Sequence, residues 1–183
     1  MRIVSGIARG RKLYTPTGMD IRPTTDKVKE ALFSILQFEL SGKYVLDLFA
    51  GTGQLGLEAI SRGAAGAVFT DSSKKSVELI KKNVSLTGFE AQSKVLFTDA
   101  FTYLTAAQDT FDIVFLDPPY EKGLCMKAAA LLPRVLRPGA VVVCETRPEE
   151  ALPENIGALS VYREYRYSGI RLTVYRTPTS EEE

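Results

Sequence analysis

The fold is decided by residues 47–56, which read Asp-Leu-Phe-Ala-Gly-Thr-Gly-Gln-Leu-Gly. They overlap the end of a short apolar run at 44–49 and lead into a segment at 55–62 that has the composition of a helix. Gly51 and Gly53 allow the tight backbone turn and the close approach to a ligand that such a strand-to-helix junction requires. The stretch therefore predicts the first strand–turn–helix unit of an α/β protein.

Strands and helices alternate along most of the chain. Apolar runs predict strands at 44–49, 67–70, 95–98, 111–116 and 140–144, and helical spacing predicts helices at 26–40, 55–62, 73–86, 100–104 and 124–136. Alternating segments at 159–167 and 170–175 predict an antiparallel hairpin, and 3–5 with 11–14 predict a small N-terminal β-hairpin. We expect an α/β fold with a mostly parallel seven-stranded sheet that ends in the antiparallel hairpin. Residues 1–24 are expected to form a basic arm, and residues 25–183 a single domain.

The composition excludes several classes of protein. The chain has 183 residues, 23 Lys and Arg against 22 Asp and Glu, and 45% hydrophobic residues, as is typical of one globular domain. It contains no histidine, which excludes Ser-His-Asp triads, Cys-His dyads and HExxH zinc sites. The spacing of Cys125 and Cys144 supports neither a zinc ribbon nor a redox pair, so we expect buried thiols and no metal. No apolar run reaches the length of a membrane span and no signal-peptide pattern begins the chain, so a cytoplasmic protein is expected.

The glycine turn has two interpretations. Gly51–Gly56 fits the GxGxxG pattern of dinucleotide sites, with Asp71 at the end of the next strand to bind a ribose. However, Asp47 would repel a pyrophosphate, whereas it suits a cationic aminoacyl group. S-adenosyl-L-methionine, with its sulfonium and amino acid tail, therefore fits better. Each acid alone is also compatible with a helix cap. The candidate cofactor-binding residues are Asp47, Phe49, Gly51, Gly53, Asp71, Asp99 and Ala100.

A second motif, Asp117-Pro118-Pro119-Tyr120, directly follows the expected strand 111–116. The two prolines fix the backbone and remove two N–H donors, so carbonyl acceptors remain beside a carboxylate and an aromatic ring. Asp117 and the Pro118 carbonyl can accept the two hydrogens of an exocyclic amine, and Tyr120 can stack on the base. These acceptors would stabilise the charge that builds on the amine during attack on a methyl group. We assign Asp117, Pro118, Pro119 and Tyr120 as candidate catalytic residues.

The N-terminal segment is basic. Residues 1–29 contain seven Lys or Arg and two Asp, namely Arg2, Arg9, Arg11, Lys12, Arg22, Lys27 and Lys29 against Asp20 and Asp26. Such a segment ahead of a neutral body suggests a polyanionic partner, although a solvated hairpin face explains the charge equally well. The candidate residues for binding such a partner, which the family resemblance described next implies to be RNA, are Arg9, Arg11, Lys12, Arg22, Thr24 and Lys27.

Three blocks of the sequence resemble one family. They are 6–13 (GIARGRKL), 22–33 (RPTTDKVKEALF) and 47–64 (DLFAGTGQLGLEAISRGA), and the likeness extends over nearly the whole chain. Together with Asp117–Tyr120 they are similar to the bacterial 16S rRNA guanine-N2 methyltransferases, the ribosomal small-subunit methyltransferase D family. The resemblance implies a Rossmann-like class I methyltransferase fold and S-adenosyl-L-methionine as cofactor. It implies methylation of guanine 966 of 16S rRNA within an assembling 30S particle, by a monomer. It also implies that 117–120 is the catalytic loop and that residues 9–12 and 22–25 face the RNA.

The sequence departs from the pattern of this family in one feature, and four alternative functions are considered. The family often has a second acid or amide shortly after the ribose-binding acid, whereas Asp71 is followed here by Ser72-Ser73. A DNA adenine-N6 methyltransferase uses the same tetrapeptide chemistry but usually has a separate recognition domain. A protein glutamine methyltransferase would suit Asn at position 117. An NAD-binding Rossmann protein would need a hydride-transfer site, and a non-enzymatic RNA-binding module would leave 117–120 without a role.

Overall fold

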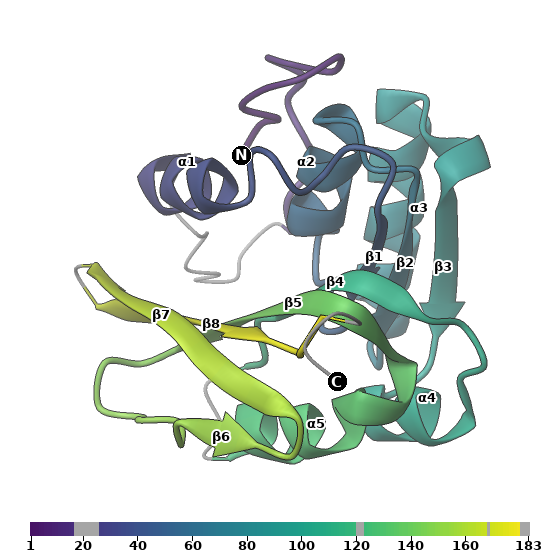
Figure 1. Ribbon diagram of the computed structural model, residues 1–183. Coiled ribbons are helices and arrows are strands. Elements are labelled where there is room, and N and C mark those ends of the chain that lie inside the picture. Colours follow the sequence, from purple (N-terminus) through teal and green to yellow (C-terminus); the bar gives the residue numbers. More distant parts are fainter. Residues whose placement is uncertain (17–25, 120–122, 168, 180–183) are drawn as a thin grey trace.

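The computed structural model describes residues 1–16, 26–119, 123–167 and 169–179. Within them, eight strands form one sheet in the order β3-β2-β1-β4-β5-β8-β7-β6 (Figure 1). The strands are β1 (Tyr44–Asp47), β2 (Gly66–Asp71), β3 (Ser93–Phe97), β4 (Phe111–Leu116), β5 (Leu136–Thr146), β6 (Asn155–Ile156), β7 (Leu159–Tyr167) and β8 (Ile170–Arg176). The helices are α1 (Asp26–Ile35), α2 (Gln54–Ser61), α3 (Lys74–Thr87), α4 (Ala100–Ala106) and α5 (Leu124–Leu131), with 3₁₀ turns η1 (Glu90–Gln92) and η2 (Leu132–Val135).

Strands β3, β2, β1, β4 and β5 run parallel, and β8, β7 and β6 continue the sheet antiparallel. The predicted α/β fold with a mostly parallel sheet and a C-terminal hairpin is therefore confirmed. The described sheet has eight strands instead of seven because the two-residue strand β6 pairs with the start of β7. The carboxyl ends of the five parallel strands meet at one edge, and the strand order reverses between β1 and β4.

Helices cover both faces of the sheet (Figure 1). Helices α1, α2 and α3 pack on one face over a core that includes Phe33, Phe69 and Phe115. Helices α4 and α5 pack on the other face, where Leu104 and Leu132 are fully buried. The parallel strands are thus apolar on both sides, which explains why their sequences lack the alternation seen in the C-terminal hairpin.

Three boundaries differ from the predictions by four or five residues. Helix α1 ends at Ile35, ahead of the Ser41-Gly42 stop signal. Helix α5 ends at Leu131 and continues as a 3₁₀ turn that contains Pro133, because proline cannot donate the helical hydrogen bond. Strand β5 then begins at Leu136 and includes the Pro138-Gly139 pair, where its pairing with β4 shifts register.

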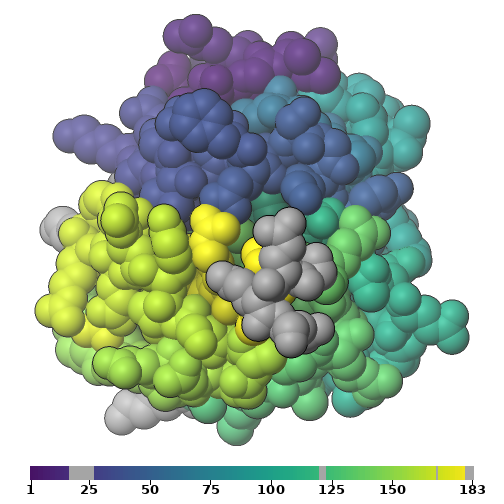
Figure 2. Space-filling model, viewed as in Figure 1, coloured from purple at the N-terminus to yellow at the C-terminus, as the bar shows by residue number. Residues whose placement is uncertain are grey.

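The N-terminal hairpin is reduced to one antiparallel bridge. Arg2 pairs with Lys12, and hydrogen bonds join Ile3 to Arg11 and to Gly10. No longer ladder forms among residues 1–16, because most of this segment's polar contacts are with the body of the protein. In Figure 2 these residues lie in purple over the blue surface that contains α1 and α2.

Candidate active site

A cavity of about 870 Å³ lies at the carboxyl edge of the parallel strands, where the strand order reverses. Doubly wound sheets bind their ligands at this position. Its lining comes from Met1, from the ends of the five parallel strands and the segments that follow them, and from the starts of α2, α4 and α5. It includes Asp47, Phe49, Gly51, Gln54, Asp71, Asp99, Ala100, Asp117, Pro118, Pro119 and Glu145. A second cavity of about 480 Å³ at another part of the sheet contains none of the predicted site residues.

The glycine turn is built as the sequence predicts. Gly51 and Gly53 have φ angles of 56° and 76°, in the left-handed region that favours glycine. Gly51 lines the cavity, whereas Gly53 does not; it caps the start of α2 and lies against Ile80. Gly53 therefore contributes to the conformation of the turn without lining the cavity.

Asp71, the last residue of β2, holds two backbone segments. Its Oδ2 accepts a hydrogen bond from the Gly51 amide at 2.9 Å, and its Oδ1 accepts one from the Ser73 amide at 2.8 Å. A carboxylate has about four lone-pair positions, so each oxygen can accept a further donor from the cavity. Asp71 can thus fix the glycine turn and still bind a pair of hydroxyl groups.

Asp99 is the N-cap of α4. Its carboxylate accepts hydrogen bonds from the amides of Phe101 and Thr102. Hydrogen bonding by the Thr102 side chain, and then by these amides, lowers the pKa of Asp99. The carboxylate is exposed and lines the cavity beside the buried Ala100. The capping role is therefore established by the geometry, and Asp99 also faces the predicted ligand site.

Three carboxyl groups converge at the ends of β1, β4 and β5. Asp47 is buried, which raises its pKa to about 7; the hydrogen bond from Gly56 opposes this rise and the charge of Asp71 adds to it. Burial also raises the pKa of Asp117 well above its usual value, and the charges of Glu145 and Asp47 contribute. Such a group of carboxyls favours a cation or a hydrogen-bond donor and disfavours an anionic ligand.

Asp117, Pro118 and Pro119 form the cavity wall directly after β4. They lie in the same cavity as the glycine turn and the acids at the ends of β1 and β2, as the sequence predicted. Tyr120, the fourth residue of the motif, lies outside the described residues. The acceptor groups of residues 117–119 therefore lie in the same cavity as the glycine turn.

Three buried polar residues of the cavity were not predicted, namely Thr52, Gln54 and Glu145. Gln54, in the first turn of α2, is 8% exposed, and its Oε1 is buried without a hydrogen-bond partner among the described residues. Glu145, near the end of β5, is 6% exposed. Glu145 carries the same signal as the acids that were predicted, since it directly follows the expected strand 140–144; Gln54 carries none.

These residues suit S-adenosyl-L-methionine. An orphaned buried acceptor such as Gln54 Oε1 requires a donor, which the ammonium group of an amino acid tail provides. The neighbouring carboxyl of Asp47 suits the same cationic end, and Asp71 suits a ribose. Apolar lining from Leu48, Phe49 and Phe101 matches the remainder of a nucleoside.

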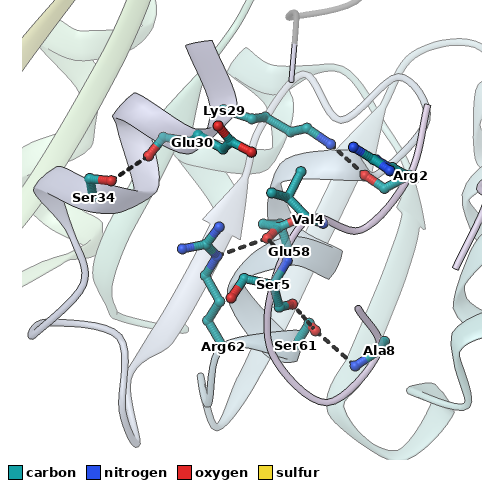
Figure 3. Close-up of polar contacts among 10 residues, drawn as sticks. All are labelled: Arg2, Val4, Ser5, Ala8, Lys29, Glu30, Ser34, Glu58, Ser61 and Arg62. Carbon is teal, nitrogen blue, oxygen red and sulfur yellow. Dashed lines mark hydrogen bonds and ion pairs between the residues drawn. The ribbon is translucent and has the colours of Figure 1, made fainter. Parts of the chain in front are cut away.

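The basic arm is anchored by buried polar groups (Figure 3). The fully buried Glu58 accepts hydrogen bonds from the amides of Val4 and Ser5 at 2.7 and 2.9 Å, and it forms an ion pair with Arg62 at 2.8 Å. The equally buried Lys29 donates to the Arg2 carbonyl at 2.6 Å, and Ser61 donates to the Ser5 carbonyl. These contacts hold the start of the arm, residues 2–5, against α1 and α2.

The predicted RNA-binding residues are placed in part. Arg9, Arg11, Lys12 and Lys27 are exposed, and the Arg11 guanidinium donates to the carbonyl of Leu86 in α3. Arg22 and Thr24 lie outside the described residues. The arm thus presents three cations, Arg9, Arg11 and Lys12, on one short loop.

Two further features concern metals and membranes. Within the described ranges, no three His, Cys, Asp or Glu residues are grouped so that they could hold a metal ion. No helix in the same ranges has both the length and the apolar character needed to span a bilayer.

Comparison with solved structures identifies the fold. The structure of yhhF from Escherichia coli is 35% identical, with a TM-score of 0.88 over 98% of this chain and 99% of that chain. A hypothetical protein from Thermus thermophilus is 28% identical, with a TM-score of 0.80 over 95% and 98%. SMU.776, solved in complex with SAH, is 15% identical with a TM-score of 0.68 over 81% of this chain, a likeness of fold alone. The fold is thus the Rossmann-like methyltransferase fold.

Comparison of sequences places the family. The family model described as Conserved hypothetical protein 95 matches residues 1–176. Ribosomal RNA small subunit methyltransferase D of Haemophilus influenzae is 38% identical over 85% of this chain and 84% of its own length. The protein of that name from Escherichia coli K12 is 38% identical over 90% and 83%. The chain therefore belongs to the Conserved hypothetical protein 95 family, a family of S-adenosylmethionine-dependent methyltransferases that contains ribosomal RNA small subunit methyltransferase D.

Proposed function

We propose that the protein methylates the exocyclic N2 amine of a guanine in 16S rRNA, guanine 966, during assembly of the small ribosomal subunit. One observation carries the proposal: Asp117, Pro118 and Pro119 line the same cavity as Gly51, Asp71 and Asp47. Acceptors for an amine thus adjoin a pocket that suits S-adenosyl-L-methionine. The names of the relatives from Haemophilus influenzae and Escherichia coli support ribosomal RNA of the small subunit as the substrate.

In the proposed complex, the glycine turn and five nearby residues bind the cofactor. Asp71 accepts the ribose hydroxyls while its bonds to Gly51 and Ser73 keep it in place. Asp47 and Gln54 bind the amino acid tail, and Ala100 with Phe49 surrounds the base. Bound S-adenosyl-L-methionine supplies an electrophilic methyl group.

The residues after β4 act on the amine. The nitrogen of a guanine amine is a poor nucleophile because its lone pair is delocalised into the ring. Asp117 and the Pro118 carbonyl accept its two hydrogens, which localises the lone pair and stabilises the positive charge that develops during attack. The nitrogen would form its bond to the methyl carbon as the sulfonium–methyl bond breaks, with S-adenosylhomocysteine as the neutral leaving group. The nitrogen would lose one proton along its hydrogen bond to Asp117. Fixed alignment of the two reactants supplies much of the remaining rate gain.

The arm provides the proposed contact with RNA. Residues 1–24, with Arg9, Arg11, Lys12, Arg22, Thr24 and also Lys27, form the RNA-facing part, and residues 25–183 form the methyltransferase domain. Hydrogen bonds to Glu58 and Lys29 hold residues 2–5 of the arm against the body of the protein. An arm held in this way suits recognition of the shape of a folded ribosomal particle. We propose that the protein acts as a monomer in the cytoplasm.

A direct assay tests the function. Purified protein is incubated with labelled S-adenosyl-L-methionine and with naked 16S rRNA, unmodified 30S particles or duplex DNA, and the labelled nucleoside is identified by mass. N2-methylguanosine at one position in 16S rRNA is the expected product. N6-methyladenine in DNA would identify the alternative activity, and the absence of any labelled nucleic acid would contradict the proposal.

A further inference from the structure

We propose that Glu145 accepts a hydrogen bond from N1–H of the target base and thereby selects guanine over purines that lack this hydrogen. The inference rests on the proposed function, since it names a residue that recognises the substrate. It concerns a residue of β5, outside the Asp117–Tyr120 motif and outside the glycine turn.

The sheet places Glu145 beside Asp117. Leu116 of β4 pairs in parallel register with Cys144 of β5, so Asp117 and Glu145 are the next residues on two neighbouring strands. Neighbouring strands lie roughly 4.8 Å apart. Both residues line the cavity, and Pro118 lines it with them. The two carboxyl groups therefore flank the position proposed for the amine.

The pairing of the strands also fixes the direction of Glu145. It pairs with Leu172 of β8, which belongs to the core on the α1–α2 face of the sheet. Asp47 pairs with Phe115 and Phe69, two residues of the same core. Glu145 and Asp47 thus extend from the same face of the sheet, toward the α2 side of the cavity.

Guanine differs from adenine and 2-aminopurine in the hydrogen that it carries on N1. Guanine presents N1–H and its N2 amine side by side on one edge, so two adjacent acceptors match two adjacent donors. An ionised carboxylate only accepts hydrogen bonds. In adenine and in 2-aminopurine, N1 carries a lone pair, which would face the Glu145 carboxylate without a bridging hydrogen. The repulsion between this lone pair and the carboxylate oxygens disfavours the wrong base.

The electrostatics of the free protein support this arrangement. The negative charge of Glu145 is one of the causes that raise the pKa of Asp117, so the two carboxyls already repel each other in the cavity. A base edge that donates one hydrogen bond to each carboxyl would relieve the repulsion. An adenine edge would donate through its amine alone and leave Glu145 opposed to a second acceptor.

Site-specific base replacement tests the inference. 16S rRNA is assembled by splinted ligation with guanine or 2-aminopurine at the methylated position, reconstituted into 30S particles and offered to wild type and Glu145→Gln. We expect wild type to prefer guanine on the order of 100-fold in kcat/KM, because 2-aminopurine keeps the amine but lacks N1–H. Glu145→Gln offers an amide N–H to the N1 lone pair, so the preference should fall at least about tenfold. Glu149→Gln, at an exposed neighbouring acid, should keep the wild-type ratio.

Each outcome decides the matter. Equal rates of wild type on both bases overturn the inference and leave the proposed function intact. An unchanged preference in folded Glu145→Gln, or inactivity of that variant on both bases, also overturns it, since Glu145 would then act in stability or catalysis. If wild type methylates neither particle, the proposed function itself fails and this inference fails with it.

Discussion

The backbone amide of Gly56 donates a 2.9 Å hydrogen bond to Oδ2 of Asp47. The bond joins the end of β1 to the first turn of α2 and holds a buried carboxyl at the cavity. Gly56 allows this approach because a Cβ at that position would lie 2.3 Å from the ring of Phe69. Asp47 is therefore both an anchor of the helix and a part of the candidate cofactor site.

Replacement of Asp47 should change how stability depends on pH. Burial raises its pKa from 3.8 to about 7, so the folded protein binds this proton more tightly than the unfolded chain does. The contribution to stability is complete below the unfolded-state pKa and is lost as the pH rises through the folded-state pKa. Asp47→Asn keeps an oxygen for Gly56 and cannot ionise. The free energy of unfolding is measured with urea at about pH 5 and about pH 8. Relative to wild type, the variant should be more stable by a few kcal/mol at the higher pH than at the lower.

A control separates this effect from general charge removal. Asp109→Asn removes an exposed acid, and its stability relative to wild type should change little between the two pH values. If the difference between Asp47→Asn and wild type is the same at both pH values, Asp47 does not bind a proton on folding.

Loss of the Asp117 side chain should abolish methyl transfer without loss of cofactor binding. Removal of one fixed acceptor of developing charge lowers kcat by roughly 100- to 1,000-fold in comparable sites. Asp117→Ala should therefore retain near wild-type affinity for S-adenosyl-L-methionine by calorimetry while transfer to 30S particles is lost. Asp117→Asn keeps an acceptor oxygen, so its kcat should lie between that of wild type and that of Asp117→Ala. Full activity of the alanine variant would remove Asp117 from the mechanism.

The positions of Asp47, Asp71, Asp99 and Asp117 could be predicted because each lies at or just after the end of an apolar strand, and parallel strands end at one edge. Gln54 could not, because a single polar residue in a helix has no periodic signal, and its burial in α2 is a result of tertiary packing. The eighth strand was missed because two residues are too few for a pattern. The single bridge between Arg2 and Lys12 depends on tertiary contacts with Glu58 and Lys29, which lie far away in sequence.

Asp71 should be required for cofactor affinity. Its carboxylate is bonded to Gly51 and Ser73, so Asp71→Ala removes both the proposed ribose acceptor and a support of the glycine turn. Hydrogen bonds to charged groups contribute about 1.5–3 kcal/mol, so the dissociation constant should rise roughly 10- to 100-fold. Ser72→Ala, at the adjacent cavity position, serves as a control. Equal affinities of wild type and Asp71→Ala in titration calorimetry would exclude the ribose assignment.

Glu58 should determine the order of the arm. Glu58→Ala leaves the amides of Val4 and Ser5 and the guanidinium of Arg62 without their acceptor. Removing one partner of a buried ion pair costs about 3–5 kcal/mol, so the melting temperature should fall and trypsin should cleave after Arg9 and Arg11 more rapidly. Glu30→Ala, at an exposed position of α1, should match wild type in both measurements. Unchanged cleavage would show that the arm is held by other contacts.

The charge of the arm should govern the salt dependence of RNA binding. Each cation that contacts a phosphate adds roughly 0.7–0.9 to the slope of log affinity against log salt concentration. Neutralising Arg9, Arg11 and Lys12 together should therefore lower affinity for 16S rRNA and reduce the slope by about 2 to 3. A control variant neutralises Lys94, Lys127 and Arg134, which are exposed and lie outside the arm. It loses the same net charge as the arm variant. If both variants reduce the slope equally, the effect comes from net charge alone, and the arm has no specific contact with RNA.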